Sequence, residues 1–257
     1  MKYIDIHCHL NFDDFDLDRQ EAIERCREKG VAMIVVGTNL DESKKATKLA
    51  EENSDIWAII GLHPTDVHNE KFNYEEYRKL AEHPRTVGIG ECGLDYYRAG
   101  HAPKALQQEV FEQHIALANE VKKPLMLHLR SGANPDQNAY KDALEVVKKH
   151  AKVPGDVHFY AGSLEEAHEF IKLGFRLSFT GVITFARNYD EIIKSIPLNM
   201  IMSETDAPYV TPAPYRGKRN EPSYVIETAH KIAEIRGESL DIVLPHLVDN
   251  ARKLFGI

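Results

Sequence analysis

The chain has 257 residues, of which 43% are hydrophobic, so it can form either one large α/β barrel or two smaller domains. Its 40 acidic and 32 basic side chains give a formal net charge of −8, which argues against a protein that coats nucleic acid through its overall charge but permits a local basic site. The N-terminus has no basic segment followed by a long apolar stretch, and apolar runs such as 31–36 are too short to span a bilayer, so we expect a cytoplasmic protein with no membrane partner.

Short β-branched segments alternate with longer segments of helical periodicity along the chain. The first strand is predicted at 3–9, and a charged helical segment follows at 18–29, with Gly30 as its stop. Seven further strands are predicted at 31–37, 56–62, 86–91, 124–129, 156–160, 175–180 and 200–204. Eight strand–helix units in a chain of this length are typical of a TIM barrel, whereas an open doubly wound sheet would use fewer strands. No linker interrupts the pattern, so we predict an α/β protein with one domain, 1–257, folded as a single TIM (β/α)8 barrel.

The segment 104–122 has a broad apolar face, which predicts a helix packed against the barrel. His114 lies on this helix, and we expect it to be packed rather than to bind a ligand. Two irregular segments, 131–138 and 207–222, directly follow strands and are rich in Gly, Pro and Asn. In a barrel such loops build the functional site at the C-terminal mouth of the strands.

His7 and His9 lie two residues apart on the first predicted strand. Residues at this spacing point to the same face about 7 Å apart, so both imidazoles can reach one ion while Cys8 points away. A lone His-x-His pair is short enough to arise by chance. The three cysteines have no paired spacing, which argues against a disulfide framework or a cysteine-based zinc ribbon.

Four later strands also end with side chains that bind metals: Glu91, His128, His158 and Asp206. Each alone could be a hydrogen-bonded buried side chain or a helix cap, but a TIM barrel brings all of these strand ends to one mouth. Imidazoles with carboxylates suit Zn²⁺, Mn²⁺ or Mg²⁺, and the missing thiolates argue against a purely structural zinc site. The residues exceed what one four-coordinate ion needs, so we expect two ions that share a bridging carboxylate and activate water.

The motifs around these residues resemble the TatD family of metal-dependent deoxyribonucleases, within the amidohydrolase-like barrel superfamily. The motifs that carry the resemblance extend along the whole chain: DIHCHL (5–10), GLHP (61–64), IGECGLDYYR (89–98), HLR (128–130), HFYAG (158–162), ETDAPY (204–209) and RGKRNEP (216–222). Two segments depart from the family pattern. HFYAG stands where the family more often has HCFSG, and 131–138 is not the usual continuation of the His-x-Arg motif. Both departures affect expected substrate contacts and leave the metal ligands in place.

The resemblance implies a site with two divalent ions, Mg²⁺ or Mn²⁺ in use, with Zn²⁺ as the alternative. It implies that His7, His9, Glu91 and Asp206 hold one ion, and that Glu91, His128 and His158 hold the other. Glu91 and Asp206 would be the catalytic residues, with Glu91 bridging and Asp206 acting as the base that orients or deprotonates the attacking water. Many relatives in the wider superfamily bridge their metals with a carboxylated lysine at the end of strand four, the place that Glu91 occupies here.

Four further residues are predicted to bind substrate: His63, Arg130, Arg216 and Arg219. Arginine offers planar donors suited to phosphate, although a solvated charged loop and a turn-stabilising histidine are the structural alternatives. Tyr96 and Tyr97 either stack on unpaired bases or pack in the core. Asp95 is expected to be a structural partner for Arg98 or for neighbouring backbone rather than a metal ligand.

The leading hypothesis is a 3′-5′ exonuclease that hydrolyses phosphodiesters of single-stranded DNA or DNA ends. The alternative is hydrolysis of an acyl or ester substrate, such as an aminoacyl-tRNA or a small amide, because two ions polarise an acyl oxygen equally well. A third hypothesis is a binding module without turnover, but such a module would be expected to lack a ligand, and all six are present. No obligatory protein partner is evident.

Overall fold

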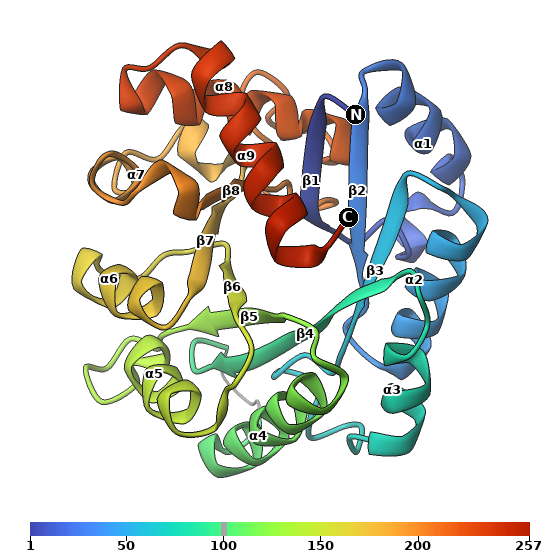
Figure 1. The fold of residues 1–257 in the computed structure, drawn as a ribbon, viewed down its shortest axis with the longest axis vertical. Coiled ribbons are helices and arrows are strands. Elements are labelled where there is room, and N and C mark those ends of the chain that lie inside the picture. The colour runs from blue at the N-terminus through green and yellow to red at the C-terminus, as the bar shows by residue number, and fades with distance from the viewer. Residues whose placement is uncertain (99–101) are drawn as a thin grey trace.

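The computed structural model describes residues 1–98 and 102–257. In this part of the chain, eight parallel strands form one sheet, and each strand pairs with the next in chain order. The strands are β1 (Tyr3–Cys8), β2 (Val31–Val36), β3 (Ile56–Ile60), β4 (Thr86–Asp95), β5 (Leu125–Arg130), β6 (Gly155–His158), β7 (Phe175–Phe179) and β8 (Ile201–Ser203). The sheet closes where Cys8 of β1 bridges to Ala207, just after β8. The predicted TIM barrel is confirmed, and Figure 1 shows its helices arranged around the strands.

The helices follow the strands in alternation. They are α1 (Arg19–Glu28), α2 (Leu40–Glu52), α3 (Tyr74–Ala81), α4 (Lys104–Val121), α5 (Ala139–His150), α6 (Leu164–Lys172), α7 (Asp190–Ser195), α8 (Val225–Arg236) and α9 (Leu240–Phe255), with short 3-10 helices η1 (Asp13–Phe15), η2 (Gly181–Thr184), η3 (Leu198–Met200) and η4 (Pro222–Tyr224). Helices α2, α3, α5 and α6 begin after Asn39, Asn73, Asn138 and Ser163, whose side chains each accept a first-turn N–H. Among the described residues, no helix is both long and apolar enough to cross a membrane.

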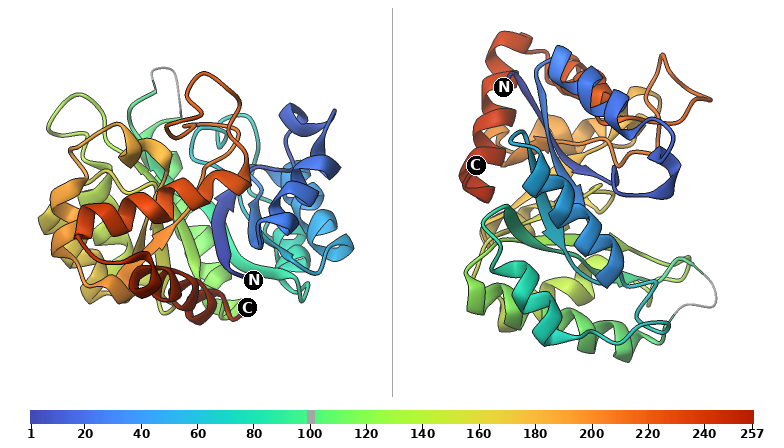
Figure 2. Two further views of the ribbon diagram at one scale, coloured as in Figure 1. Left: turned by 90° about the horizontal axis from the view of Figure 1, so that it is seen from above. Right: turned by 90° about the vertical axis from the view of Figure 1, so that its right-hand side faces the viewer.

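Helix α9 closes one end of the barrel. Its buried residues Val248, Ala251, Leu254 and Phe255 form one apolar cluster with strand residues Ile4, Ile6, Ile34, Val36, Ile59, Val87, Met126 and Met202. Figure 2 shows α9 beside both chain termini, at the end opposite the long loop that follows β8. The polar residues that end the strands lie at the other end, because the strands are parallel and all carry these residues at their C-terminal ends.

Most strands differ from their predicted bounds by one or two residues, and the structure explains the differences in β6 and β4. Strand β6 ends at His158, two residues before the predicted end, because Phe159 takes a left-handed φ of 47° and donates its N–H to Glu204 Oε1 at 2.6 Å. Strand β4 continues to Asp95, beyond its predicted end at residue 91, because its pairing with β5 extends to Arg130. Both differences depend on partners that are distant in sequence.

His114 of α4 is fully buried, as expected, and it has a structural role. Its Nε2 accepts the N–H of Leu62 at 2.9 Å, so the proton must lie on Nδ1, which is 2.8 Å from the carbonyl oxygen of Val110. Burial lowers the pKa of His114 to about 4. The neutral imidazole therefore ties α4 to the loop after β3, which also carries His63.

We expect His114 to make folding stability depend on pH. The folded pKa of about 4 lies below the ordinary value of 6.5, so this contribution is complete above pH 6.5 and is lost as the pH falls toward 4. Between pH 7 and pH 5 the wild type should lose about 2 kcal/mol through this group. Urea unfolding at both pH values should show that His114→Gln loses less free energy of unfolding than the wild type does. His246→Gln, at an exposed position on α9, should lose as much as the wild type. Equal pH dependence in all three proteins would contradict the assignment.

Candidate metal centre

The six predicted ligands meet at the open mouth of the barrel. Five of them, His9, Glu91, His128, His158 and Asp206, line a cavity of about 730 Å³, and His7 lies fully buried beneath it. The ligand atoms fall into three groups whose members lie within 4.8 Å of one another: His7, Glu91 and His158; His7, His9 and Asp206; and His63, Glu91 and His128. Residues from four strands and three strand-following loops thus form one cluster.

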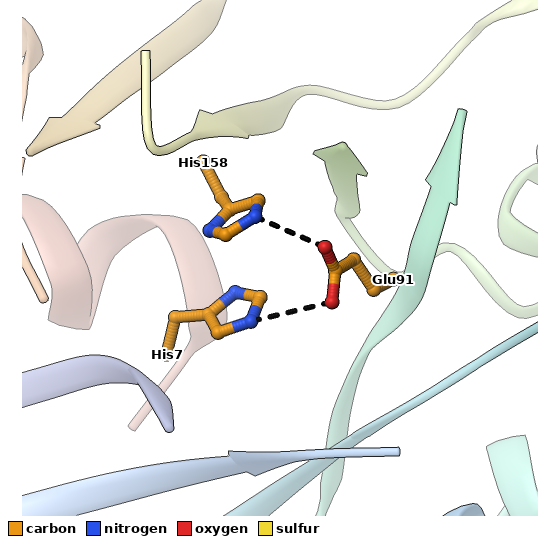
Figure 3. Close-up of side chains that lie close together, drawn as sticks. All are labelled: His7, Glu91 and His158. Carbon is orange, nitrogen blue, oxygen red and sulfur yellow. Dashed lines mark ion pairs between the residues drawn. The ribbon is translucent and has the colours of Figure 1, made fainter. Parts of the chain in front are cut away.

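Glu91 lies at the centre of the cluster and points one oxygen to each side. Its Oε2 is 3.4 Å from His7 Nε2 and 3.7 Å from His9 Nε2. Its Oε1 is 2.7 Å from His128 Nδ1 and 3.0 Å from His158 Nε2. Figure 3 shows His7 and His158 facing different oxygens of this carboxylate. On the first side, Asp206 Oδ1 is 3.4 Å from His9 Nε2 and 3.7 Å from His7 Nε2.

The backbone joins β1 to the segment after β8 directly beside the ligands. Asp206 has a left-handed φ of 57° and donates its N–H to the carbonyl oxygen of His7 at 2.9 Å. The N–H of His9 donates in turn to the carbonyl oxygen of Ala207 at 2.7 Å. Beneath them the buried carboxylate of Asp5 accepts the N–H of Thr205 at 2.9 Å. These bonds hold His7, His9 and Asp206 in one place, although the chain brings them from its two ends.

Gly90 explains how Glu91 reaches the cavity. A Cβ at Gly90 would lie 2.4 Å from the carbonyl oxygen of Met126, and its φ of 152° is one that other residues rarely adopt. The pairing between β4 and β5 shifts register between Ile89 and Cys92, which brackets this position. Glycine therefore allows β4 to approach β5 closely at the point where Glu91 turns inward.

The second nitrogen of each imidazole faces an oxygen of the protein. His9 Nδ1 is 3.0 Å from the carbonyl oxygen of Val36, and His128 Nε2 is 3.2 Å from Asp95 Oδ2. His158 Nδ1 is 3.4 Å from Glu204 Oε1, and His7 Nδ1 is 4.0 Å from Glu204 Oε2. Oxygen partners of this kind orient metal-binding histidines and fix which nitrogen is free to bind.

Glu204 was not predicted as a functional residue, yet it is fully buried under two of the histidines. Its place next to Thr205 and Asp206 in the ETDAPY motif was the only sequence signal. Asp95 was predicted to contact Arg98 or neighbouring backbone. Its Oδ1 does accept the backbone N–H groups of Tyr97 and Arg98, at 2.9 and 3.2 Å, but its contact with His128 was missed.

The residues fit divalent metal ions. His7 Nε2 and His9 Nε2 lie 3.2 Å apart. This distance is close to the separation of about 3.4 Å between two nitrogens bound at about 2.1 Å to one tetrahedral ion. The ligand side chains are buried or half-buried, so water does not fully solvate their charges. Such a concentration of imidazoles and carboxylates away from water is stabilised by a bound cation.

The charges of the site also favour a cation. Burial alone would raise the pKa of Glu91, but His158, His63 and His7 hold it well below its usual value. Burial likewise opposes ionisation of Asp206, yet its bond to His9 and the other imidazoles lower its pKa. Burial alone would lower the pKa of His158, but Glu204 and Glu91 raise it. A metal must therefore compete with protons for the imidazole of His158. Metal binding is therefore expected to weaken at low pH.

Of the predicted substrate-binding residues, His63 and Arg130 line the cavity. His63 Nδ1 accepts the N–H of Thr65 at 3.2 Å, so the proton lies on Nε2, which is 3.4 Å from Glu91 Oε1. A protonated Nε2 is a donor, and this favours a hydrogen-bonding role over direct metal ligation. Tyr96 is half-buried and its hydroxyl bonds Asp142 at 2.9 Å, which matches the packing alternative.

Arg216 and Arg219 are not among the residues that line the cavity. Arg216 donates to the carbonyl oxygen of Thr211 at 3.0 Å and lies over the ring of Phe185. Arg219 bonds both carboxylate oxygens of Asp18, at 2.7 and 2.8 Å, and lowers the pKa of Asp18 to about 2. The structure instead brings Arg98 into the cavity lining. Sequence reasoning had placed Arg98 only as a partner of Asp95.

Comparisons with known proteins show which family the chain resembles along its length. A family model described as TatD related DNase matches residues 4–256. The protein named "Uncharacterized metal-dependent hydrolase YabD" of Bacillus subtilis is 39% identical, over 98% of this chain and 98% of its own. The "3'-5' ssDNA/RNA exonuclease TatD" of Klebsiella pneumoniae is 35% identical, over 98% of this chain and 97% of its own. The crystal structure of the TatD homolog YJJV from Escherichia coli superposes with a TM-score of 0.90 at 27% identity, covering 100% of this chain and 98% of that one.

Proposed function

The chain belongs to the TatD-related DNase family of metal-dependent hydrolases, and from this premise we propose that it is a deoxyribonuclease that removes nucleotides from the 3′ end of single-stranded DNA. A relative that is 35% identical along nearly its whole length bears the name of a 3′-5′ exonuclease of single-stranded DNA and RNA. The substrate is phosphodiester-linked and the reaction is hydrolysis. Mg²⁺ or Mn²⁺ is the proposed ion in use, with Zn²⁺ as the alternative.

The observation that carries the proposal is the position of Glu91, which points one oxygen toward His7 and His9 and the other toward His128 and His158. We assign His7, His9 and Asp206 to one ion, His128 and His158 to a second, and Glu91 to both. Ions bound by these residues would supply Lewis acidity at a phosphate oxygen and would lower the pKa of a water molecule.

The protein's own groups handle the proton and the orientation of substrate. Asp206 lines the cavity, and its imidazole neighbours hold its pKa below the usual range, so its carboxylate is ionised and can accept the proton of the attacking water. His63 is kept neutral because burial and His128 lower its pKa. With its proton on Nε2, His63 can donate a hydrogen bond to a phosphate oxygen as the substrate enters.

Digestion of a 5′-labelled single-stranded oligonucleotide tests the proposal. In the presence of Mg²⁺ or Mn²⁺, the wild type is expected to produce a ladder of products shortened by one nucleotide at a time. The ladder should disappear with chelator and in Asp206→Asn, because either change removes a part of the machinery that activates water. Lack of cleavage with Mg²⁺, Mn²⁺ and Zn²⁺ would rule out the nuclease, and turnover of an aminoacyl ester under the same conditions would support the ester alternative.

A further inference from the structure

Two arginines at the rim of the cavity have no carboxylate partner in the part of the chain that the structure describes. Arg98 and Arg130 both line the cavity, and among the described residues neither forms an ion pair. Other arginines, such as Arg25, Arg78 and Arg219, pair with Asp or Glu. In a chain with 40 acidic against 32 basic side chains, two unpaired guanidinium groups beside the metal centre are available for an anionic ligand.

The structure holds both arginines close to the metal ligands. The guanidinium of Arg130 lies over the exposed ring of Tyr97, 4.0 Å from the ring centre, and this stacking leaves its N–H groups free to bind in the plane. The backbone N–H groups of Tyr97 and Arg98 both donate to Asp95 Oδ1. The other oxygen of Asp95 contacts His128. One carboxylate therefore connects the arginine-bearing turn to a candidate metal ligand.

The spacing of Arg130 relative to the metal centre is set by β5. His128 and Arg130 are two residues apart on this strand, so their side chains leave the same face about 7 Å apart. This separation is comparable to that of neighbouring phosphates in an extended single strand. A phosphate at the metal centre would thus place the next phosphate of the same strand near the two arginines.

We propose that Arg98 and Arg130 form a second anion subsite, which binds the phosphate next to the one under attack. This inference rests on the proposed nuclease function and refines it, because it defines the preferred substrate as a chain with at least two consecutive phosphates. The metal centre binds the reacting phosphate, and the arginines bind its neighbour and align the strand. Both arginines act on substrate binding rather than on the attacking water.

Hydrolysis of two short thymidine substrates tests the subsite. A dinucleotide carries one phosphate and a trinucleotide carries two, so only the trinucleotide can occupy both positions. The kcat/KM of the wild type should be higher for the trinucleotide by about tenfold or more, because one charge-assisted contact to the second phosphate has an effect of this size. Arg98→Gln and Arg130→Gln should each reduce this ratio severalfold, chiefly through KM. Arg78 lies on α3 and pairs with Glu82, so Arg78→Gln serves as the control and should leave the ratio at the wild-type value.

Binding without turnover separates failure of the subsite from failure of the nuclease. In an Asp206→Asn background, which keeps the Glu91 carboxylate, the double change Arg98→Gln and Arg130→Gln should weaken binding of a fluorescent single-stranded oligonucleotide by about tenfold or more, measured by anisotropy. The slope of log affinity against log salt should also fall by about one for each arginine that contacts a phosphate. Unchanged binding and an unchanged trinucleotide ratio would overturn the subsite. Hydrolysis of neither substrate, with binding still sensitive to the arginines, would overturn the nuclease and retain the subsite.

Discussion

Replacing Glu91 with glutamine is expected to lower kcat on single-stranded DNA by on the order of 10³-fold or more. Among the described residues, Glu91 is the only carboxylate within 3.7 Å of both the His7–His9 pair and the His128–His158 pair. All of these neighbours are imidazoles, so none of them repels the negative charge of Glu91. Glutamine keeps the shape but presents one neutral oxygen and one NH₂ group to these nitrogens. Metal ions stabilise transition-state charge by several kcal/mol, and each 1.36 kcal/mol corresponds to about a tenfold change in rate.

The effect of Glu91→Gln is measured by single-turnover digestion together with elemental analysis of bound metal. The variant should lose metal as well as activity, whereas Glu165→Gln, an exposed position on α6, should keep both. Thermal unfolding of the metal-free proteins controls for damage to the fold. A Glu91→Gln protein that retains its metal and more than about a tenth of the wild-type rate would contradict the central role of this carboxylate.

Replacing Glu204 with glutamine is expected to weaken metal binding by about 10- to 100-fold. Glu204 is fully buried, and its two oxygens face His158 Nδ1 at 3.4 Å and His7 Nδ1 at 4.0 Å. Its negative charge favours a proton on these Nδ1 atoms, which leaves the Nε2 atoms free to bind metal. Glutamine keeps an oxygen for the N–H of Phe159 but loses this charge.

Competition with a metal chelator measures the affinity change, and unfolding with and without metal separates it from a loss of folding stability. Weaker binding should appear as a reduced gain of stability on adding metal, because a ligand stabilises the folded state according to its affinity. If Glu204→Gln lowers stability equally with and without metal and leaves the affinity unchanged, Glu204 supports the fold and has no influence on the ligands.

The long loop after β8 shows how little a sequence motif says about the direction of its side chains. It suggested Arg216 and Arg219 as substrate-binding residues, because both lie in a motif that follows a barrel strand. In the structure Arg219 bonds Asp18, a residue 201 positions earlier in the chain, and neither arginine lines the cavity. Arg98 lines the cavity instead. The direction of a long surface side chain depends on which partner lies within reach, and a sequence motif does not contain this information.

The sequence by itself determined the barrel and predicted six candidate metal ligands that lie together in the structure, His7, His9, Glu91, His128, His158 and Asp206. Both depend on local patterns, since strand and helix periodicity defines the units and the closed barrel brings the C-terminal ends of its strands to one mouth. Only the tertiary structure decided the partners of these ligands. Glu204, just after β8, reaches Phe159 and His158 at the end of β6, two strands away, and α9 closes the opposite end with apolar residues from its last two turns. Such contacts join segments that are far apart in the chain, so their geometry is fixed by packing rather than by residue type.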